Sequence, residues 1–284
     1  MAPNGQTNRL LGYPADARLL IVNADDFGMC NSINEAIVGA LDGGLVRSTS
    51  LMVACPWALQ AINYLKDRSD IPFGVHLTVI CDADNYRWGP ITSKERVSNL
   101  VDRAGSFYSV EQFPKALNQA VLEQLEVEFR AQIEVVLAVG LQPTHLDWHC
   151  LRMDNKIDVF DLMLRLAKEY GLAFRITGRS YIQKAQGQGL PSNDYDLLDS
   201  WTLDPVNKPA RYAQMLHELP AGLSEWAVHP GIDNSELLAL EPDGNHFRQT
   251  DYDFWTSTLA KDIVREEGII LLDYRALQAV WKEK

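Results

Sequence analysis

The sequence lacks the features that mark membrane-bound, secreted or disulfide-stabilised proteins. No apolar stretch approaches the roughly 20 residues that a membrane-spanning helix needs. The N-terminal residues 1–18 contain no long apolar run, so we expect no secretory signal. The four cysteines form no C-x-x-C pair and a chain of this size needs no disulfide, which favours a reducing compartment. We therefore expect a cytoplasmic protein.

Positive charge is also scarce. The chain has 26 Lys and Arg residues against 38 Asp and Glu residues, and its formal net charge is −12. An acidic surface repels phosphates and anionic lipids, so we expect no nucleic-acid and no membrane partner. The 284 residues, 46% of them hydrophobic, are ample for a sizeable core. The oligomeric state stays open, and a homo-oligomer is one alternative.

Strands and helices are expected to alternate along the whole chain. Short apolar runs bounded by polar residues indicate buried strands, and amphipathic stretches indicate helices. We predict strands over residues 19–22, 48–53, 73–77, 144–148, 173–176, 225–228 and 269–272. We predict helices over residues 32–43, 56–66, 116–139, 157–170, 210–219 and 276–281, with another beginning near 250. Residues 81–112 and 177–200 are interpreted as two long loops, and residues 232–249 as a polar loop.

This alternation is typical of a parallel α/β architecture. At this length an irregular TIM-like (β/α) barrel accounts for the pattern better than an open doubly wound sheet. We expect a single domain over residues 1–284, in which residues 1–17 form an N-terminal extension. No G-x-G-x-x-G follows the first strand, which argues against dinucleotide binding.

Acidic and imidazole side chains follow the ends of the predicted strands. Asp25 and Asp26 come after the first strand, His76 ends the third, and His229 ends a later one. The carboxyl ends of parallel barrel strands converge on one rim, so these side chains should meet in one polar site. Adjacent carboxylates on a strand point in different directions, so one can bind a cation while the other accepts a proton. Solvated turn residues and a hydrogen-bonded core histidine are the alternative interpretations.

The segment 144–149 adds a second cluster. His145, Asp147 and His149 alternate along an extended backbone and so face one side. Imidazoles beside a carboxylate suit zinc and similar ions, and Asp147 can orient a histidine from behind. A polar loop cluster is the alternative. The adjoining Cys150 is either a thiolate ligand or an inert buried thiol.

Aromatic residues are available near these segments. Trp88, Tyr86 and Trp148 could together form a stacking surface for a sugar ring. Ordinary packing in the core or in a loop is the alternative for each of them.

Together and in order, these segments resemble the YdjC-like carbohydrate deacetylase family, which includes the chitooligosaccharide deacetylases. The matching segments lie within about residues 18 to 275 and are 23–28 (NADDFG), 49–52 (TSLM), 74–78 (GVHLT), 143–149 (PTHLDWH) and 229–230 (HP). The resemblance implies a distorted TIM-like barrel, one divalent metal ion and hydrolysis of N-acetyl groups on amino sugars or oligosaccharides.

The resemblance also implies roles for individual residues. By position, Asp26, His76 and His149 look like the metal ligands, and Asp25 looks like the catalytic base. His229 looks like a second catalytic or substrate-facing group.

Four further residues are candidates for contacts with the substrate or for positions behind the ligands: His145, Asp147, Trp88 and Arg175. Arg175 matches an arginine often found after the fifth strand, to which we assign no role. Where the family usually continues with further histidines, this chain has Cys150, Leu151 and Arg152. Two histidines and an aspartate suit zinc, and magnesium is the alternative ion.

Two other functions are compatible with the same residues. A metal-dependent phosphoesterase would need several arginines or lysines for phosphate, and the candidates near the motifs are Arg47, Arg152, Arg175 and Arg179. A non-catalytic sugar- or metal-binding protein is the other alternative. Acetate release that depends on a metal would favour the deacetylase, and phosphate release the phosphoesterase.

Overall fold

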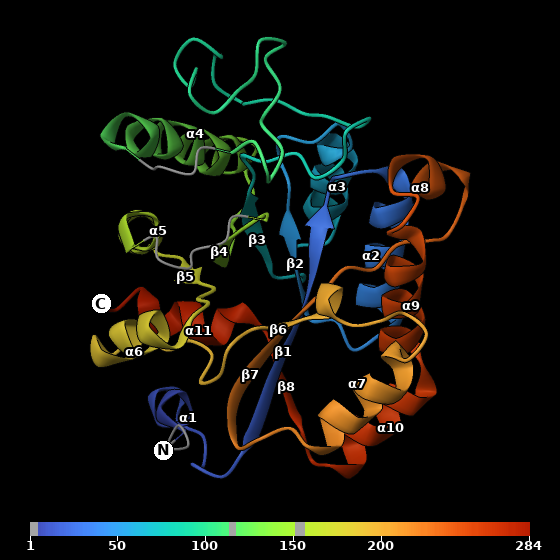
Figure 1. The fold of residues 1–284 in the computed structure, drawn as a ribbon. Coiled ribbons are helices and arrows are strands. Elements are labelled where there is room, and N and C mark those ends of the chain that lie inside the picture. Colours follow the sequence, from blue (N-terminus) through green and yellow to red (C-terminus); the bar gives the residue numbers. More distant parts are fainter. Residues whose placement is uncertain (1–4, 114–117, 151–156) are drawn as a thin grey trace.

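Eight parallel strands form one curled sheet in the computed structural model, which describes residues 5–113, 118–150 and 157–284 (Figure 1). The strands are β1 (Arg18–Phe27), β2 (Ser48–Leu51), β3 (Phe73–Leu77), β4 (His145–Trp148), β5 (Ala173–Phe174), β6 (Leu198–Asp199), β7 (Gly222–Val228) and β8 (Ile270–Leu272). Their order is β5-β4-β3-β2-β1-β7-β6, and β8 pairs with β1. The parallel α/β prediction is therefore confirmed.

The sheet is open between β5 and β6. No ladder joins these two strands within the part of the chain that the structure describes. The curled sheet thus forms a partial barrel, and full closure into a TIM-like barrel stays a prediction. Both edge strands have only two residues each, so the opening is bordered by short strands.

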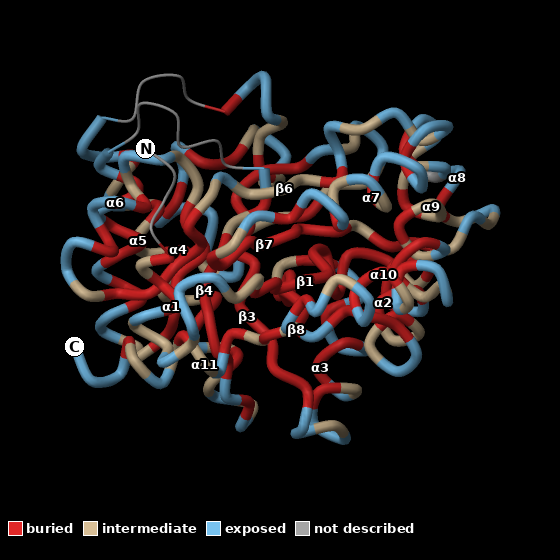
Figure 2. The backbone as a smooth tube through the Cα atoms, turned by 90° about the horizontal axis from the view of Figure 1, so that it is seen from below, coloured by how far each residue is buried: buried red, intermediate tan, exposed pale blue. Residues whose placement is uncertain are grey.

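Helices lie to the left and to the right of the curled sheet in Figure 1. They are α1 (Gln6–Leu11), α2 (Asn31–Gly43), α3 (Ala58–Asp67), α4 (Gln119–Ala138), α5 (Ile157–Tyr170), α6 (Arg179–Gly187), α7 (Lys208–His217), α8 (Ser235–Leu240), α9 (Asn245–Thr256), α10 (Thr258–Glu266) and α11 (Tyr274–Trp281), with a 3₁₀ turn, η1 (Ser200–Thr202). Figure 2 shows that the strands are buried while the helices keep their exposed residues on the outside. Among the described residues, no helix combines the length and the apolar character that a membrane crossing demands.

The central strand β1 is longer than its apolar run predicted. Leu19 to Val22 are fully buried, as expected for a strand covered on both faces of a parallel sheet. The strand then continues to Phe27 through polar residues that are also buried. Asp25 and Asp26 therefore lie within the end of β1 rather than after it, because pairing with β2 resumes at Phe27, beyond both aspartates.

The largest error of the sequence prediction concerns the second long loop. Residues 177–200 contain α6 and β6, and the supposed polar loop after β7 contains α8 and the start of α9. These segments are too polar to show a clear apolar period, and their contacts with the rest of the fold decide their structure. The other long loop is confirmed: residues 81–113 hold isolated bridges but no helix or strand. In Figure 1 this segment lies above the carboxyl ends of the strands.

The predicted N-terminal extension includes α1. The Thr7 hydroxyl donates to the carbonyl of Ser192, and the Asn8 amide donates to the carbonyls of Pro14 and Ala17. Both side chains are fully buried. The Thr7 bond fixes α1 against the chain that follows α6, and the Asn8 bonds fix it against the residues that lead into β1.

Candidate metal centre and catalytic site

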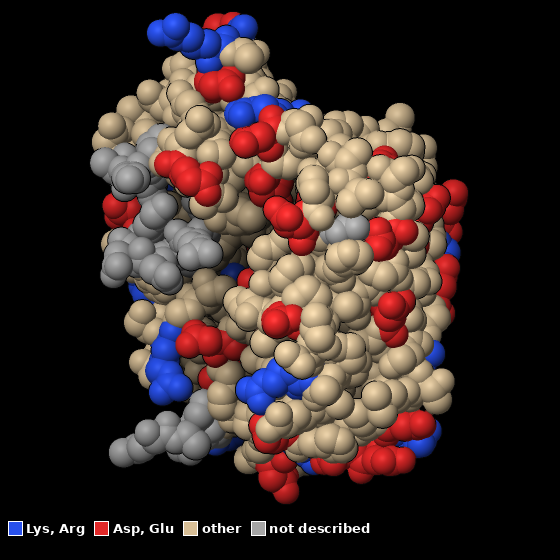
Figure 3. All heavy atoms as spheres, turned by 45° about the vertical axis from the view of Figure 1, so that its right-hand side comes forward, with Lys and Arg blue, Asp and Glu red and all other residues tan. Residues whose placement is uncertain are grey.

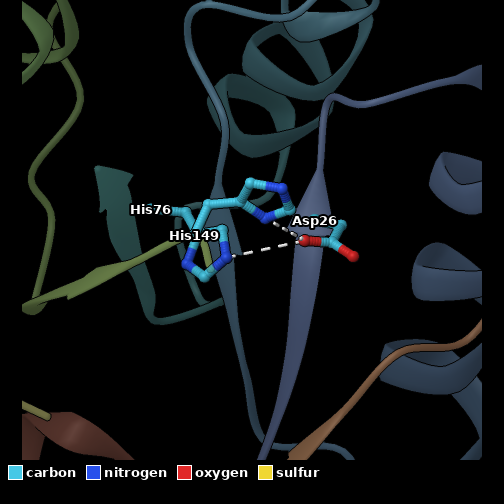
Figure 4. Close-up of side chains that lie close together, drawn as sticks. All are labelled: Asp26, His76 and His149. Atoms are coloured by element: carbon cyan, nitrogen blue, oxygen red, sulfur yellow. Dashed lines mark hydrogen bonds and ion pairs between the residues drawn. The ribbon is translucent and has the colours of Figure 1, made fainter. Parts of the chain in front are cut away.

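Three ligand-type side chains from distant parts of the chain meet at the carboxyl edge of the sheet (Figure 4). Oδ1 of Asp26 lies 3.5 Å from Nε2 of His76 and 3.2 Å from Nδ1 of His149. All three side chains are buried. Asp26 comes from β1, His76 from β3, and His149 directly follows β4, so the meeting predicted from strand ends is present.

A bulge in β1 places Asp25 and Asp26 at the same centre. The register with β2 shifts between Ala24 and Phe27, and Asp26 has a φ of 73°, a conformation that costs energy for a residue other than glycine. As a result Oδ2 of Asp25 also lies 4.0 Å from Nε2 of His76. The expectation that adjacent carboxylates point in different directions holds for a regular strand, and the bulge overrides it.

Each imidazole of this group has a carboxylate behind it. Nδ1 of His76 hydrogen-bonds Oδ1 of Asp147 at 2.8 Å, and Nε2 of His149 lies 3.2 Å from Oδ2 of Asp82. A carboxylate on the outer nitrogen fixes the ring and leaves the inner nitrogen as the ligand, which is the usual arrangement of metal-binding histidines. The donor set therefore fits a divalent cation.

The charges of the group point to the same conclusion. Burial disfavours the charged imidazole, but Asp147 and Asp25 nevertheless raise the pKa of His76 to about 9. Burial likewise opposes the charge of His149, yet Cys150, Asp82 and Asp26 hold its pKa well above the usual value. The surrounding carboxylates thus favour positive charge on both rings, and a divalent ion would supply such charge at the same place.

Asp26 stays ionised despite its burial. Burial alone would raise its pKa, but the Arg248 guanidinium and hydrogen bonds from His149 and His76 hold that pKa well below the usual value. Nη1 of Arg248 donates to Oδ2 of Asp26 at 2.8 Å, which leaves Oδ1 for the two imidazoles. Two further bonds from Arg248, at 2.6 and 2.9 Å, go to Glu241.

Arg175 holds Asp25 through two hydrogen bonds. Nη1 donates to Oδ2 at 2.7 Å and Nη2 donates to Oδ1 at 2.9 Å, while the Asn23 amide donates to Oδ1 at 2.8 Å. A carboxylate has about four lone-pair positions, so one position on Oδ2 is free of these donors. That oxygen lies 4.0 Å from Nε2 of both His76 and His229. Asp25 therefore presents one basic oxygen to the centre.

Arg175 also neutralises the other buried carboxylates of this layer. Its Nη1 lies 3.0 Å from Oδ2 of Asp147, and its Nε donates to Glu225 at 2.6 Å. The Tyr274 hydroxyl donates to the same Glu225 oxygen. Burial opposes the guanidinium charge, but Asp147, Asp25 and Glu225 keep the pKa of Arg175 well above its usual value. The residue without an assigned role thus links three carboxylates.

His145 lies deeper in the sheet than the three ligands. Its ring stacks on Tyr274 with 3.6 Å between the centroids, and its Nε2 is 3.7 Å from Oδ2 of Asp147. A Cβ atom added at Gly74 would lie 2.4 Å from that nitrogen, so only glycine leaves room for the ring. His145 and Asp147 do face one side, as predicted, and His145 packs beneath the carboxylate.

His229 lies at the more exposed side of the site. Its Nδ1 is 2.8 Å from the Ser200 hydroxyl, and its backbone N–H donates to Oδ2 of Asp251 at 2.8 Å. Its side chain is 16% exposed. Since Nε2 faces Asp25 and the side chain is partly exposed, His229 is placed to exchange a proton with a molecule bound there.

The remaining candidates surround His149. The Trp88 ring is buried, donates its N–H to the carbonyl of Ile80, and lies edge-on to His149 at 5.9 Å between centroids. Cys150 is exposed rather than buried, and its sulfur is 3.6 Å from Nε2 of His149. Leu151 and Arg152 lie outside the described residues.

Sequence analysis missed several residues that complete the site. Arg248 and Glu241 belong to segments interpreted as loop, and Asp82 lies in a genuine loop. Ser200, Glu225 and Tyr274 belong to no recognised motif. The available signal for Glu225 was its charge within an apolar strand, since a buried carboxylate requires a partner.

The chain is similar to known proteins of one family. Residues 19–266 match the family model described as "YdjC-like protein". A carbohydrate deacetylase of Thermoanaerobacter pseudethanolicus is 30% identical over 92% of this chain and all of that protein. A carbohydrate deacetylase of Geobacillus stearothermophilus is 34% identical over 91% of this chain and 97% of that protein.

A solved structure is similar over nearly the same length. It is described as that of a candidate cellobiose-phosphate cleavage protein from Enterococcus faecalis. The TM-score is 0.79 at 28% identity, and the match covers 92% of this chain and 99% of that one.

Proposed function

The chain belongs to the family of YdjC-like proteins, and on this basis we propose that it hydrolyses N-acetyl groups on amino sugars with the help of one divalent metal ion. One observation carries the proposal. Asp26, His76 and His149 converge at one buried point, with a carboxylate behind each imidazole. The deacetylase names of the relatives support the substrate class.

The ion would be held by Asp26, His76 and His149. When bound, it supplies Lewis acidity toward water and toward the acetamide carbonyl. Two imidazoles and a carboxylate suit zinc, with magnesium as the alternative. Arg248 keeps Asp26 ionised, so the ligand carboxylate needs no deprotonation at neutral pH.

Asp25 is the proposed base. Its Oδ2 atom is the oxygen that faces the centre, and Arg175 and Asn23 fix the direction of that oxygen. A positioned carboxylate can accept a proton from the attacking water, and that water then adds to the acetamide carbon. Asp147 and Arg175 hold the surrounding charges in place during this transfer.

His229 is the proposed acid. Its Nε2 can donate a proton to the nitrogen of the substrate as the bond between carbonyl carbon and nitrogen breaks. The Ser200 hydroxyl on Nδ1 fixes the orientation of the ring. One water is consumed, and the products are acetate and a free amino sugar. The proton that Asp25 accepts balances the one that His229 gives.

The variant Asp25→Asn tests the assignment of the base. Asparagine keeps the size of the side chain and lies outside the proposed ligand set, so the variant should still bind the ion, more weakly because one carboxylate near His76 is lost. It should lose nearly all turnover, because an amide does not accept the proton. Acetate release from a panel of N-acetylated saccharides with added metals is the measurement. Wild-type turnover in this variant would show that Asp25 is not the base.

A phosphoesterase is the second candidate, and the observation that favours it is the phosphorylated sugar in the description of the Enterococcus faecalis structure. The buried arginines argue against it here, since Arg175 and Arg248 are already bound by carboxylates. Figure 3 shows many acidic and few basic side chains on one face, which repels an anionic substrate. Phosphate release without acetate release would favour the phosphoesterase.

A further inference from the structure

An exposed tryptophan lies beside the proposed acid. Trp201, in η1, keeps 44% of its surface exposed although it follows the buried Ser200. Its ring lies edge-on to His229, with 5.6 Å between the centroids and 68° between the planes. A single exposed apolar side chain is common, and what distinguishes Trp201 is its contact with His229.

The orientation of the indole is fixed by its neighbours. The ring of Phe247 stacks against it at 5.5 Å, and the guanidinium carbon of Arg248 lies 5.2 Å from its centroid. A Cβ atom added at Gly244 would lie 3.1 Å from Cη2 of the ring, so glycine leaves the space that the indole needs. The ring is therefore presented in one position before any ligand arrives, which lowers the entropic cost of binding.

Single side chains connect this ring to the reacting groups. Arg248, which lies against the indole, also donates to Asp26. His229, which contacts the indole edge, lies 4.0 Å from Oδ2 of Asp25. A molecule resting on the indole would thus place its substituents next to His229 and Asp25.

A carboxylate lies next to the indole. The side chain of Asp199 is 42% exposed, and its Oδ1 accepts the backbone N–H of Trp201 at 2.9 Å. The same oxygen is 4.0 Å from Nδ1 of His229. An exposed carboxylate has lone pairs left for hydroxyl donors, and a sugar carries several hydroxyls.

We propose that Trp201 and Asp199 form a sugar-binding subsite, in which the indole stacks on the pyranose ring of an N-acetylated amino sugar and Asp199 accepts its hydroxyl hydrogen bonds. The C–H groups on one face of a pyranose form an apolar surface with slight positive charge, which matches the negative face of an aromatic ring. This inference rests on the proposed function. It adds to that function the residues that hold the sugar while His229 and Asp25 act.

The test compares Trp201→Ala with Trp201→Phe, which keeps an aromatic face. Val206→Ala is the matched control, because Val206 is an exposed apolar residue, 87% exposed, in the same connection between η1 and α7. Acetate release from a β-1,4-linked disaccharide of N-acetylglucosamine gives kcat and KM. Saturation-transfer NMR with the same disaccharide, on each variant combined with Asp25→Asn, reports sugar binding without turnover.

Trp201→Ala should raise KM about tenfold, equivalent to about 1.4 kcal/mol, with kcat little changed and the transfer to the ring protons reduced. Trp201→Phe should retain most of the affinity, and Val206→Ala all of it. Unchanged KM and unchanged transfer in Trp201→Ala would overturn the subsite. So would an equal loss in Trp201→Phe, since the indole would then only support the loop. If the unmodified protein releases no acetate but the sugar signal still depends on Trp201, the proposed reaction fails and the subsite stands.

Discussion

The floor and the rim of the site use similar residues but differ in their access to water. The floor consists of Asp25, Asp26, His76, Asp147 and Arg175, each at most 5% exposed. The rim consists of Asp82, Asp199, Trp201 and His229, whose exposed fractions range from 16% to 44%. On the floor every charge has a fixed partner at hydrogen-bond or ion-pair distance, whereas the rim retains free surface.

This difference assigns different tasks to the two regions. Buried charges interact strongly, and removing one partner leaves the other without compensation. The floor therefore fixes the positions of the ligands and the base, and the loss of any one of its charges should cost much of the free energy of unfolding. Exposed groups interact weakly with each other, so the rim can change its partners and accommodate a substrate. The following predictions test whether the two regions separate in this way.

The largest effect is expected from Arg175→Met. This change leaves Asp25, Asp147 and Glu225 without their shared cation and should lower the free energy of unfolding by about 3–5 kcal/mol. The rim variant Asp199→Asn should change it by less than about 1 kcal/mol, because asparagine also caps η1. Urea unfolding followed by circular dichroism measures both. Equal losses would remove the distinction between floor and rim.

A smaller effect is expected on metal affinity when a carboxylate behind a ligand is changed. Asp147→Asn should weaken metal binding by about 10–100-fold, since Asp147 orients His76 from a fully buried position. Asp82→Asn, behind His149 at the partly exposed rim, should cost less. Competition with a chelating dye gives both dissociation constants. If Asp82→Asn costs as much as Asp147→Asn, burial does not decide the effect.

The pKa of His76 predicts a pH dependence of metal binding. Its value of about 9 lies above the ordinary 6.5, so the ring is charged below pH about 9 and must lose a proton to bind an ion. The metal affinity should rise with pH up to about 9, by at most about tenfold per unit for this proton. The same shift stabilises the metal-free fold fully below pH 6.5, and this contribution is lost as the pH rises through about 9. Calorimetric titrations in buffers of different ionisation enthalpy measure the released proton, and an affinity that is flat from pH 7 to 9 contradicts the prediction.

The smallest effect is expected from Ser200→Ala. The hydroxyl orients His229 through one hydrogen bond, which is worth about 1 kcal/mol or about fivefold in kcat. Metal affinity should not change, because Ser200 contacts no ligand of the proposed ion. Steady-state acetate release measures kcat, and competition with a chelating dye measures the metal affinity. A loss of metal affinity would show that the buried Ser200, which supports the rim residue His229, also supports the floor.

The sequence predicted those parts of the site that follow from the rule that parallel strands share one carboxyl edge. Asp26, His76, His149 and His229 all follow or end buried apolar strands, and the structure brings them together. The strand boundaries were nearly correct where the apolar run was complete, as in β3. They failed where polar residues continue a strand, as at the end of β1, because the partner strands rather than the local residues decide such an extension.

The rule that parallel strands share one carboxyl edge does not predict Arg248 or the Trp201 indole. Arg248 lies on α9, in a segment that its polar composition indicated as a loop, and Trp201 lies in η1, directly after the other predicted loop. The buried Trp88 was singled out because it is near the motifs, whereas the exposed ring beside His229 is Trp201. The exposure of a side chain depends on which other segments pack over it, and the local sequence does not determine this packing.

The sequence by itself determined the alternation of strands and helices and the residue types at the strand ends, because hydrophobic period and strand position are local properties. Only the tertiary structure decided that a bulge turns both aspartates toward His76, that Arg175 and Arg248 neutralise them, and that the Trp201 indole stays partly exposed beside His229. These features depend on distances between segments up to 222 residues apart in the chain, and such distances exist only after the sheet has formed.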